Sequence, residues 1–131
     1  ERALVSVAEQ NHASIEHIVI DGGSTDGTGE ILARHRPNLA QVVSERDRGI
    51  YDAMNKGIQL AKGDYILFLN AGDTFASAKT LKNILKELAQ NPDVLYGEAV
   101  FVNNEGVHLG LRSEVTPHHL PASLTWEDFR F

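Results

Sequence analysis

The stretch IVIDGGSTDGT, residues 18–28, decides the fold of this chain. An apolar run that ends at Asp21 predicts a buried strand, and the small polar residues after it predict a loop. The same order recurs in YILFLNAGD, residues 65–73. In an open α/β sheet, ligands bind just beyond the carboxyl ends of the strands. We therefore expect Asp21 and Asp73 to converge on one site for a polar, phosphorylated ligand.

The rest of the pattern alternates helices with strands. Apolar residues at helical spacing predict helices at 1–11, 27–36, 50–62 and 78–90. Strands are expected at 16–21, 40–44, 64–69, 93–102 and 107–112, the last two joined as a hairpin. The continuous apolar run at 64–69 is typical of a strand buried on both faces. The alternation predicts an α/β fold with a mostly parallel, Rossmann-like sheet and flanking helices.

Length and composition narrow the class of protein. The chain has 131 residues and no cysteine, so disulfides and thiolate metal sites are excluded. Its net charge of −6 argues against a general nucleic-acid binder. No apolar run approaches the roughly 20 residues that span a bilayer. The sequence opens inside an expected helix, and we interpret residues 1–131 as a single, partial domain cut at both ends.

The loop after the first expected strand offers a carboxylate beside two glycines. Asp21 can accept hydrogen bonds from a ribose hydroxyl or a base N–H, and Gly22 and Gly23 let a ligand come close. The alternative is that Asp21 only caps a turn, as aspartate often does. Asp26, a little further along, is expected to cap the helix that follows rather than bind a ligand.

The second loop, Asn70 to Asp73, offers oxygen ligands for a hard cation. Mg²⁺ or Mn²⁺ takes one or two carboxylates beside substrate phosphates, so Asp73 is the expected metal ligand and Asn70 a neutral partner. The alternative is a simple turn, because Asn and Asp favour tight bends.

A third polar stretch lies at residues 44–57. Arg46, Arg48 and Lys56 are candidates for phosphate contacts. Asp52 and Asn55 are three residues apart, so they share one side of the expected helix and can reach the site from its amino end. An ordinary solvated helix start explains the same residues equally well.

Other familiar motifs are absent. No stretch has the G-x-G-x-x-G or P-loop spacing. Leu32 stands where an EF-hand beginning at Asp21 needs its twelfth-position Glu. His118 and His119 are adjacent, so they would point apart in an extended chain and make a poor chelate.

Residues 18–28, 45–57 and 63–73 together resemble the family 2 glycosyltransferases of the GT-A fold. The phrase DRGIYDAMNKG, residues 47–57, followed by FLNAGD, residues 68–73, looks like the bacterial branch that includes colanic-acid and other exopolysaccharide transferases. The resemblance implies inverting transfer of a sugar from a nucleotide-diphospho-sugar to an acceptor hydroxyl. The residues it implies for donor binding are Asp21, Gly22, Gly23, Arg46, Asp47, Asp52, Asn55, Asn70 and Ala71.

The resemblance also implies a divalent cation, Mg²⁺ or Mn²⁺, at Asp73. The chain departs from the family pattern where Gly22 replaces a second acid and where Asn70 and Gly72 replace two acids of the usual Asp-x-Asp-Asp run. The catalytic residue is unknown: the resemblance puts the family's first strand before residue 1 and the catalytic base beyond residue 131. Asp128 superficially resembles that base but lies close in sequence to the metal loop.

Partners and location follow from the same resemblance. The acceptor is expected to be a saccharide or a lipid-linked saccharide, in the cytoplasm or at the inner face of the cell membrane with peripheral attachment. Two other functions stay open. One is a binding module that has lost its chemistry, which the replacements at Asn70 and Gly72 favour. The other is a nucleotidyltransferase, which shares the architecture.

Overall fold

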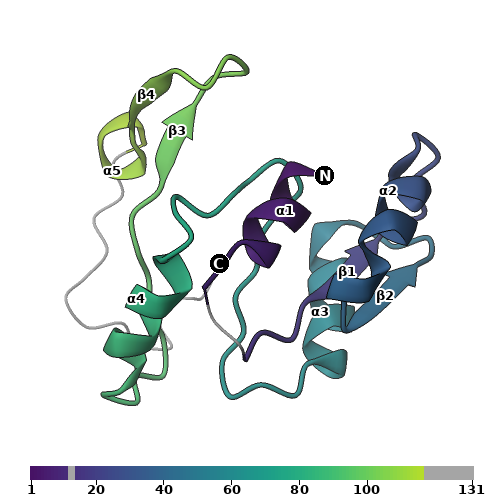
Figure 1. Ribbon diagram of the computed structural model, residues 1–131, viewed down its shortest axis with the longest axis horizontal. Helices are drawn as coiled ribbons and strands as arrows, with labels where there is room; N and C mark the ends of the chain where they lie inside the picture. Colours follow the sequence, from purple (N-terminus) through teal and green to yellow (C-terminus); the bar gives the residue numbers. More distant parts are fainter. Residues whose placement is uncertain (12–13, 117–131) are drawn as a thin grey trace. The chain divides into compact units, whose positions relative to one another are not determined.

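A computed structural model describes residues 1–11 and 14–116. They fall into two compact units, one built from residues up to Gln90 and one from Asn91 onward. Figure 1 labels the helices and strands of both. In the part of the chain that the structure describes, no helix has the length and apolar character needed to cross a bilayer.

The first unit is built around two parallel strands. Strand β1 (Ile18–Asp21) pairs with β2 (Gln41–Ser44), and the register places Asp21 beside Ser44. Between them the chain forms α2 (Thr28–His35) and the short 3₁₀ helix η1 (Arg36–Asn38). Figure 1 shows the two strands side by side, with α3 (Ile50–Leu60) against β1. This β-α-β unit confirms the predicted parallel pairing.

Two further helices complete this unit, α1 (Arg2–Ala8) and α4 (Thr80–Leu88). The buried apolar side chains are few: Val7 in α1, Leu32 in α2 and Leu39 just before β2. Two polar residues, Gln10 and Asp21, are equally buried. Since buried polar groups need partners, both point to specific hydrogen-bond networks.

The strand predicted at 64–69 is wrong. The structure forms no strand there, and the four residues from Tyr65 to Phe68 are 42–50% exposed. An apolar run favours burial, but a strand also needs a neighbour for its backbone hydrogen bonds. Within the described residues, neither β1 nor β2 pairs with this segment.

The second unit contains a hairpin. Strand β3 (Val100–Val102) pairs antiparallel with β4 (His108–Leu111), with an irregularity between Phe101 and Val102, and α5 (Arg112–Val115) follows. The Asn103 side chain accepts hydrogen bonds from the backbone of Glu105 and Val107, which closes the predicted turn. The strand predicted at 93–102 shrinks to its last three residues, because only these have a partner strand.

Candidate functional site

Asp21 is the centre of a hydrogen-bond network at the carboxyl ends of β1 and β2. The backbone N–H of Ser24 donates to both of its oxygens, at 3.1 and 3.3 Å. The hydroxyls of Ser24 and Ser44 donate to one oxygen each. These bonds lower the pKa of Asp21 below its ordinary value, and the bond from the Ser24 side chain has the largest effect. Asp21 is thus an ionised carboxylate, only 8% exposed, that ties its own loop to the end of β2.

Gly22 and Gly23 let that loop approach the segment that follows β2. A Cβ placed on Gly22 would lie 2.7 Å from Oδ2 of Asp47, closer than real contacts allow. Gly23 has φ +83°, and a Cβ there would lie 3.4 Å from the backbone nitrogen of Arg46. The structure therefore brings together five of the predicted donor-binding residues: Asp21, Gly22, Gly23, Arg46 and Asp47.

The loop from Glu45 to Gly49 is fixed to the start of α3. Lys56 in α3 pairs with Glu45 at 2.8 Å, and its Nζ donates to the Arg46 carbonyl oxygen at 3.4 Å. The hydrogen bond to Glu45 is the main reason that the pKa of Lys56 is raised. The sequence suggested Lys56 as a phosphate contact, but here it holds the loop. The Arg46 side chain is left with no hydrogen bond or ion pair in residues 1–11 and 14–116.

Asp52 and Asn55 lie on α3, beyond this loop. Asp52 accepts a hydrogen bond from the backbone N–H of Arg48 at 3.1 Å and lies 3.7 Å from Lys56 Nζ. It therefore stabilises the start of α3, where a negative charge suits the helix dipole. Asn55 is exposed. Whether either residue contacts a donor stays a prediction.

The loop at 70–73 is a solvent-exposed turn. The backbone N–H of Asp73 donates to the Asn70 carbonyl oxygen at 3.1 Å, and Gly72 has φ +100°. The side chains of Asn70, Ala71 and Asp73 are exposed. Among the described residues, no hydrogen bond or ion pair joins this loop to the Asp21 network, so their shared crevice stays a prediction.

Asp73 and Asn70 offer oxygen ligands, the kind that Mg²⁺ and Mn²⁺ prefer. Over residues 1–11 and 14–116 there is no group of three His, Cys, Asp or Glu side chains that could hold a metal ion. One carboxylate suits a cation that is completed by substrate phosphates, so the donor set fits a metal bound together with a diphosphate.

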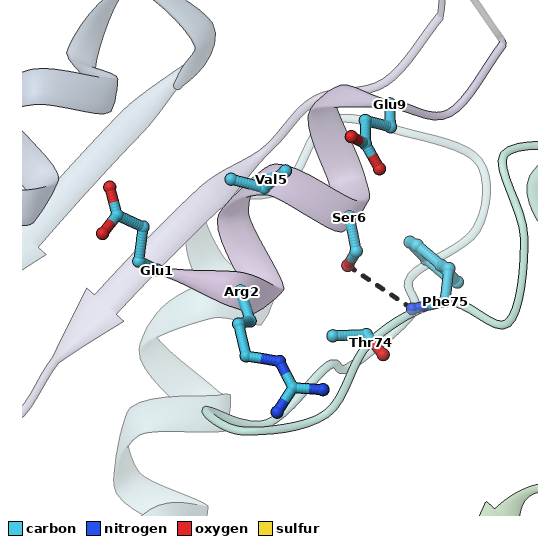
Figure 2. Close-up of a pocket in the computed structure, with 7 residues that line it drawn as sticks. All are labelled: Glu1, Arg2, Val5, Ser6, Glu9, Thr74 and Phe75. Atoms are coloured by element: carbon cyan, nitrogen blue, oxygen red, sulfur yellow. Dashed lines mark hydrogen bonds between the residues drawn. The ribbon is translucent and has the colours of Figure 1, made fainter. Parts of the chain in front are cut away.

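The segment after this loop is fastened to the residues that follow α1 by the buried side chain of Gln10. Its Nε2 donates to the Ser77 carbonyl oxygen at 2.8 Å, and its Oε1 accepts from the backbone N–H of Leu81 at 3.0 Å. A neighbouring pocket has a volume of about 410 Å³, and Arg2 and Thr74 are among the residues that line it. Within this lining the backbone N–H of Phe75 donates a hydrogen bond to the Ser6 hydroxyl (Figure 2). Gln10 thus fixes the segment that follows Asp73 in the chain.

A comparison with known families decides the class of protein. The profile of "Glycosyl transferase family 2" matches residues 1–130. The chain belongs to glycosyl transferase family 2. The predicted GT-A fold class is therefore confirmed, while the exopolysaccharide branch stays a prediction.

Curated relatives carry matching names. A "PGL/p-HBAD biosynthesis glycosyltransferase" of Mycobacterium bovis is 37% identical over 102 residues, which are 74% of this chain and 40% of the relative. An "uncharacterized glycosyltransferase" of Mycobacterium tuberculosis is 41% identical over 90 residues, 68% of this chain and 34% of the relative. One from Nostoc sp. is 32% identical over 97 residues, 72% of this chain and 30% of the relative. No solved structure matches.

Two residues of this family 2 site escaped the sequence reasoning. Ser44 contacts Asp21 only because the parallel register places the two strand ends together, and a serine at the end of the second strand was the one available signal. Gln10 fell within the helix expected at 1–11, but it ends up beyond α1 and carried no signal other than being polar. The candidate base Asp128 and the pair His118 and His119 lie outside the described residues.

Proposed function

We propose that the protein transfers a sugar from a nucleotide-diphospho-sugar to an acceptor hydroxyl, with inversion at the sugar carbon. The family match over residues 1–130 carries this proposal. The chain spans at most about two fifths of the length of the relatives reported above, so the activity is a property of the whole protein.

The described residues divide between the two ends of such a donor. Carboxylates repel phosphate, so the carboxyl ends of β1 and β2, with Asp21 and Asp47, suit the uncharged nucleoside. The exposed guanidinium of Arg46, with no partner in the described residues, suits a phosphate oxygen. Asp52, which accepts a hydrogen bond from the Arg48 N–H, and the exposed Asn55 would extend the same binding surface along α3.

Asp73, with Asn70 and Ala71 in its turn, would hold a divalent cation against the diphosphate. The cation supplies positive charge that stabilises the nucleoside diphosphate as a leaving group. The catalytic base lies outside residues 1–131 in this proposal, so the 131-residue chain alone should be inactive or nearly so. The acceptor in this proposal is a saccharide or a lipid-linked saccharide, reached by peripheral association with a membrane.

Nucleotide binding tests the proposal. The protein from its complete reading frame is titrated with UDP, GDP, dTDP and ADP, with and without Mn²⁺. We expect one nucleotide to bind more tightly with Mn²⁺ by about tenfold or more. Asp73→Ala should abolish the metal effect, and Asp64→Ala, which removes another exposed aspartate of the first unit, should keep it. If none of the nucleoside diphosphates binds, the proposal is wrong.

A binding module without chemistry is the second candidate, because Asn70 and Gly72 leave a single carboxylate in the loop. It predicts nucleotide affinity that ignores both Mn²⁺ and Asp73→Ala. A continuous assay of nucleoside diphosphate release separates the two: the transferase releases product only with an acceptor and the complete protein. Release by the 131-residue chain at the same rate would contradict the placement of the base.

A further inference from the structure

At the carboxyl ends of β1 and β2, the side chain of Asp47 occupies the space that a side chain at position 22 would need. A Cβ on Gly22 would lie 2.7 Å from Oδ2, 3.2 Å from Cγ and 3.4 Å from Oδ1 of Asp47. All three atoms of the carboxylate therefore face the bare backbone of Gly22. The loop after β2 thus fills the space that a side chain at the end of β1 would take.

The Asp47 carboxylate is held in that position from its own side. Its Oδ1 accepts a hydrogen bond from the backbone N–H of Gly49 at 2.9 Å. The loop around it is fixed by the contacts of Lys56 with Glu45 and with the Arg46 carbonyl oxygen. A carboxylate held this way needs little reordering when it meets a ligand, which favours binding.

The two carboxylates of this edge differ in what they have left to offer. Both oxygens of Asp21 already accept hydrogen bonds from Ser24 and Ser44, and the residue is buried. Oδ2 of Asp47 has no hydrogen-bond donor in residues 1–11 and 14–116, and the residue is partly exposed. A carboxylate oxygen can accept two hydrogen bonds, so Asp47 retains capacity where Asp21 has little.

We propose that Oδ2 of Asp47 accepts a hydrogen bond from an N–H or hydroxyl group of the donor nucleoside, and that Gly22 is required because it leaves room for this carboxylate. This inference rests on the proposed function and makes it more specific. Asp21 then acts as a positioning residue that joins the two loops, while Asp47 contacts the ligand. The partner is the nucleoside because a phosphate would be repelled.

A double-mutant cycle tests the proposal. Asp47→Ala should weaken nucleoside diphosphate binding about ten- to hundredfold, the usual value of a hydrogen bond to a charged group. Inorganic pyrophosphate, used as a competitor, should bind as before, because it lacks the nucleoside. Asp64→Ala is the control carboxylate and should change neither affinity.

Gly22→Ala supplies the other arm. Its new methyl group would displace the Asp47 carboxylate, so it should weaken nucleotide binding in the wild-type background but have little further effect in Asp47→Ala. Nucleotides that lack the 2′- or the 3′-hydroxyl locate the partner: if the effect of Asp47→Ala disappears with one of them, that ribose hydroxyl is the donor, and if the effect persists with both, the base is.

Failure takes a distinct form for each claim. If the wild-type protein binds no nucleoside diphosphate, the proposed function itself is wrong. If it binds one and Asp47→Ala keeps the affinity, or loses pyrophosphate affinity equally, only the role of Asp47 is overturned. Gly22→Ala effects that add fully to those of Asp47→Ala would show that the two positions are not coupled.

Discussion

Two segments of the first unit carry nearly the same sequence signal and adopt different structures. Residues 18–21 form β1, pair with β2, and end at a buried carboxylate with three hydrogen-bond donor groups. Residues 65–69 form no strand, and the turn after them leaves Asp73 exposed. The difference shows that an apolar run becomes a strand only where another strand supplies its backbone partners.

The same contrast separates two uses of aspartate. At the end of β1 the protein itself supplies the hydrogen-bond donors, so the Asp21 carboxylate stabilises the folded loop. At the turn of residues 70–73 the protein supplies none to the Asp73 carboxylate within the described residues, so that carboxylate is open to a cation. The comparison predicts large stability effects at the first segment, and smaller stability effects together with effects on ligand binding at the second.

Truncating one leucine in each region should break the comparison most clearly. Leu32, in the helix that joins β1 to β2, is 6% exposed, whereas Leu67 is 50% exposed. Leu32→Ala should lower the free energy of unfolding by about 2–5 kcal/mol. Leu67→Ala should lower it by about 1 kcal/mol or less. Urea unfolding measures both, and equal losses would mean that residues 65–69 are packed as tightly as the helix.

Removing the Asp21 carboxylate should have the next largest effect. Asp21→Ala leaves the Ser24 N–H and the hydroxyls of Ser24 and Ser44 without their acceptor, at a cost of about 1–3 kcal/mol. Ser44→Ala removes only one of these bonds and should cost less. Urea unfolding of both variants tests the order, and a larger loss in Ser44→Ala would show that Asp21 is not the centre of the network.

Acid should reproduce the loss at Asp21. Its pKa is lowered in the folded protein, so between that pKa and about 3.9, the value in an unfolded chain, only the unfolded state takes up a proton. The stability it confers is present above about pH 3.9 and is lost as the pH falls through the folded pKa. The difference in unfolding free energy between wild type and Asp21→Ala should therefore shrink on acidification, and a constant difference would contradict the ionised network.

Sequence reasoning succeeded where the signal is local. The helical spacing of Ile50, Met54 and Ile58 predicted α3, and the turn residues Asn103 and Gly106 predicted the hairpin. The same kind of local signal predicted a binding site at the carboxyl end of β1, and that site stays a prediction.

It failed where the cause is distant in sequence. Nothing within residues 64–69 states whether a partner strand is present, and the need for glycine at position 22 comes from Asp47. The predicted closeness of Asp21 and Asp73 depends on such a pairing too. The sequence therefore predicts that the two loops exist better than it predicts how far apart they lie.

Substituting His17 should have a smaller effect on stability, and this effect concerns only the region around the paired strands β1 and β2. It lies just before β1, lines a pocket with Val7 and Gln10, and has its pKa lowered by burial. The folded protein thus favours the neutral ring, and stability should fall as the pH drops below about 6.5, where the unfolded chain takes up the proton. His17→Gln should flatten this part of the stability profile between pH 5 and 7, which thermal unfolding measures. His108→Gln, in the second unit, should leave the slope of stability against pH unchanged. If His108→Gln removed the slope instead, the titration would belong to His108 and not to His17.

The smallest change in stability is expected from Asn70→Asp, which adds a second carboxylate to the exposed turn. Because the side chain at position 70 faces solvent, the free energy of unfolding should change by about 0.5 kcal/mol or less, while Mn²⁺ should enhance nucleotide binding more than in the wild type. Gly72→Asp adds the same charge two residues later but forces a side chain onto a backbone at φ +100°, so it should destabilise the protein by about 1–2 kcal/mol. Calorimetric titration with Mn²⁺ and nucleotide, beside urea unfolding, compares the two. Tighter metal binding at no cost in Asn70→Asp would show that this turn is built to hold a ligand, whereas unchanged metal dependence would separate Asp73 from the cation.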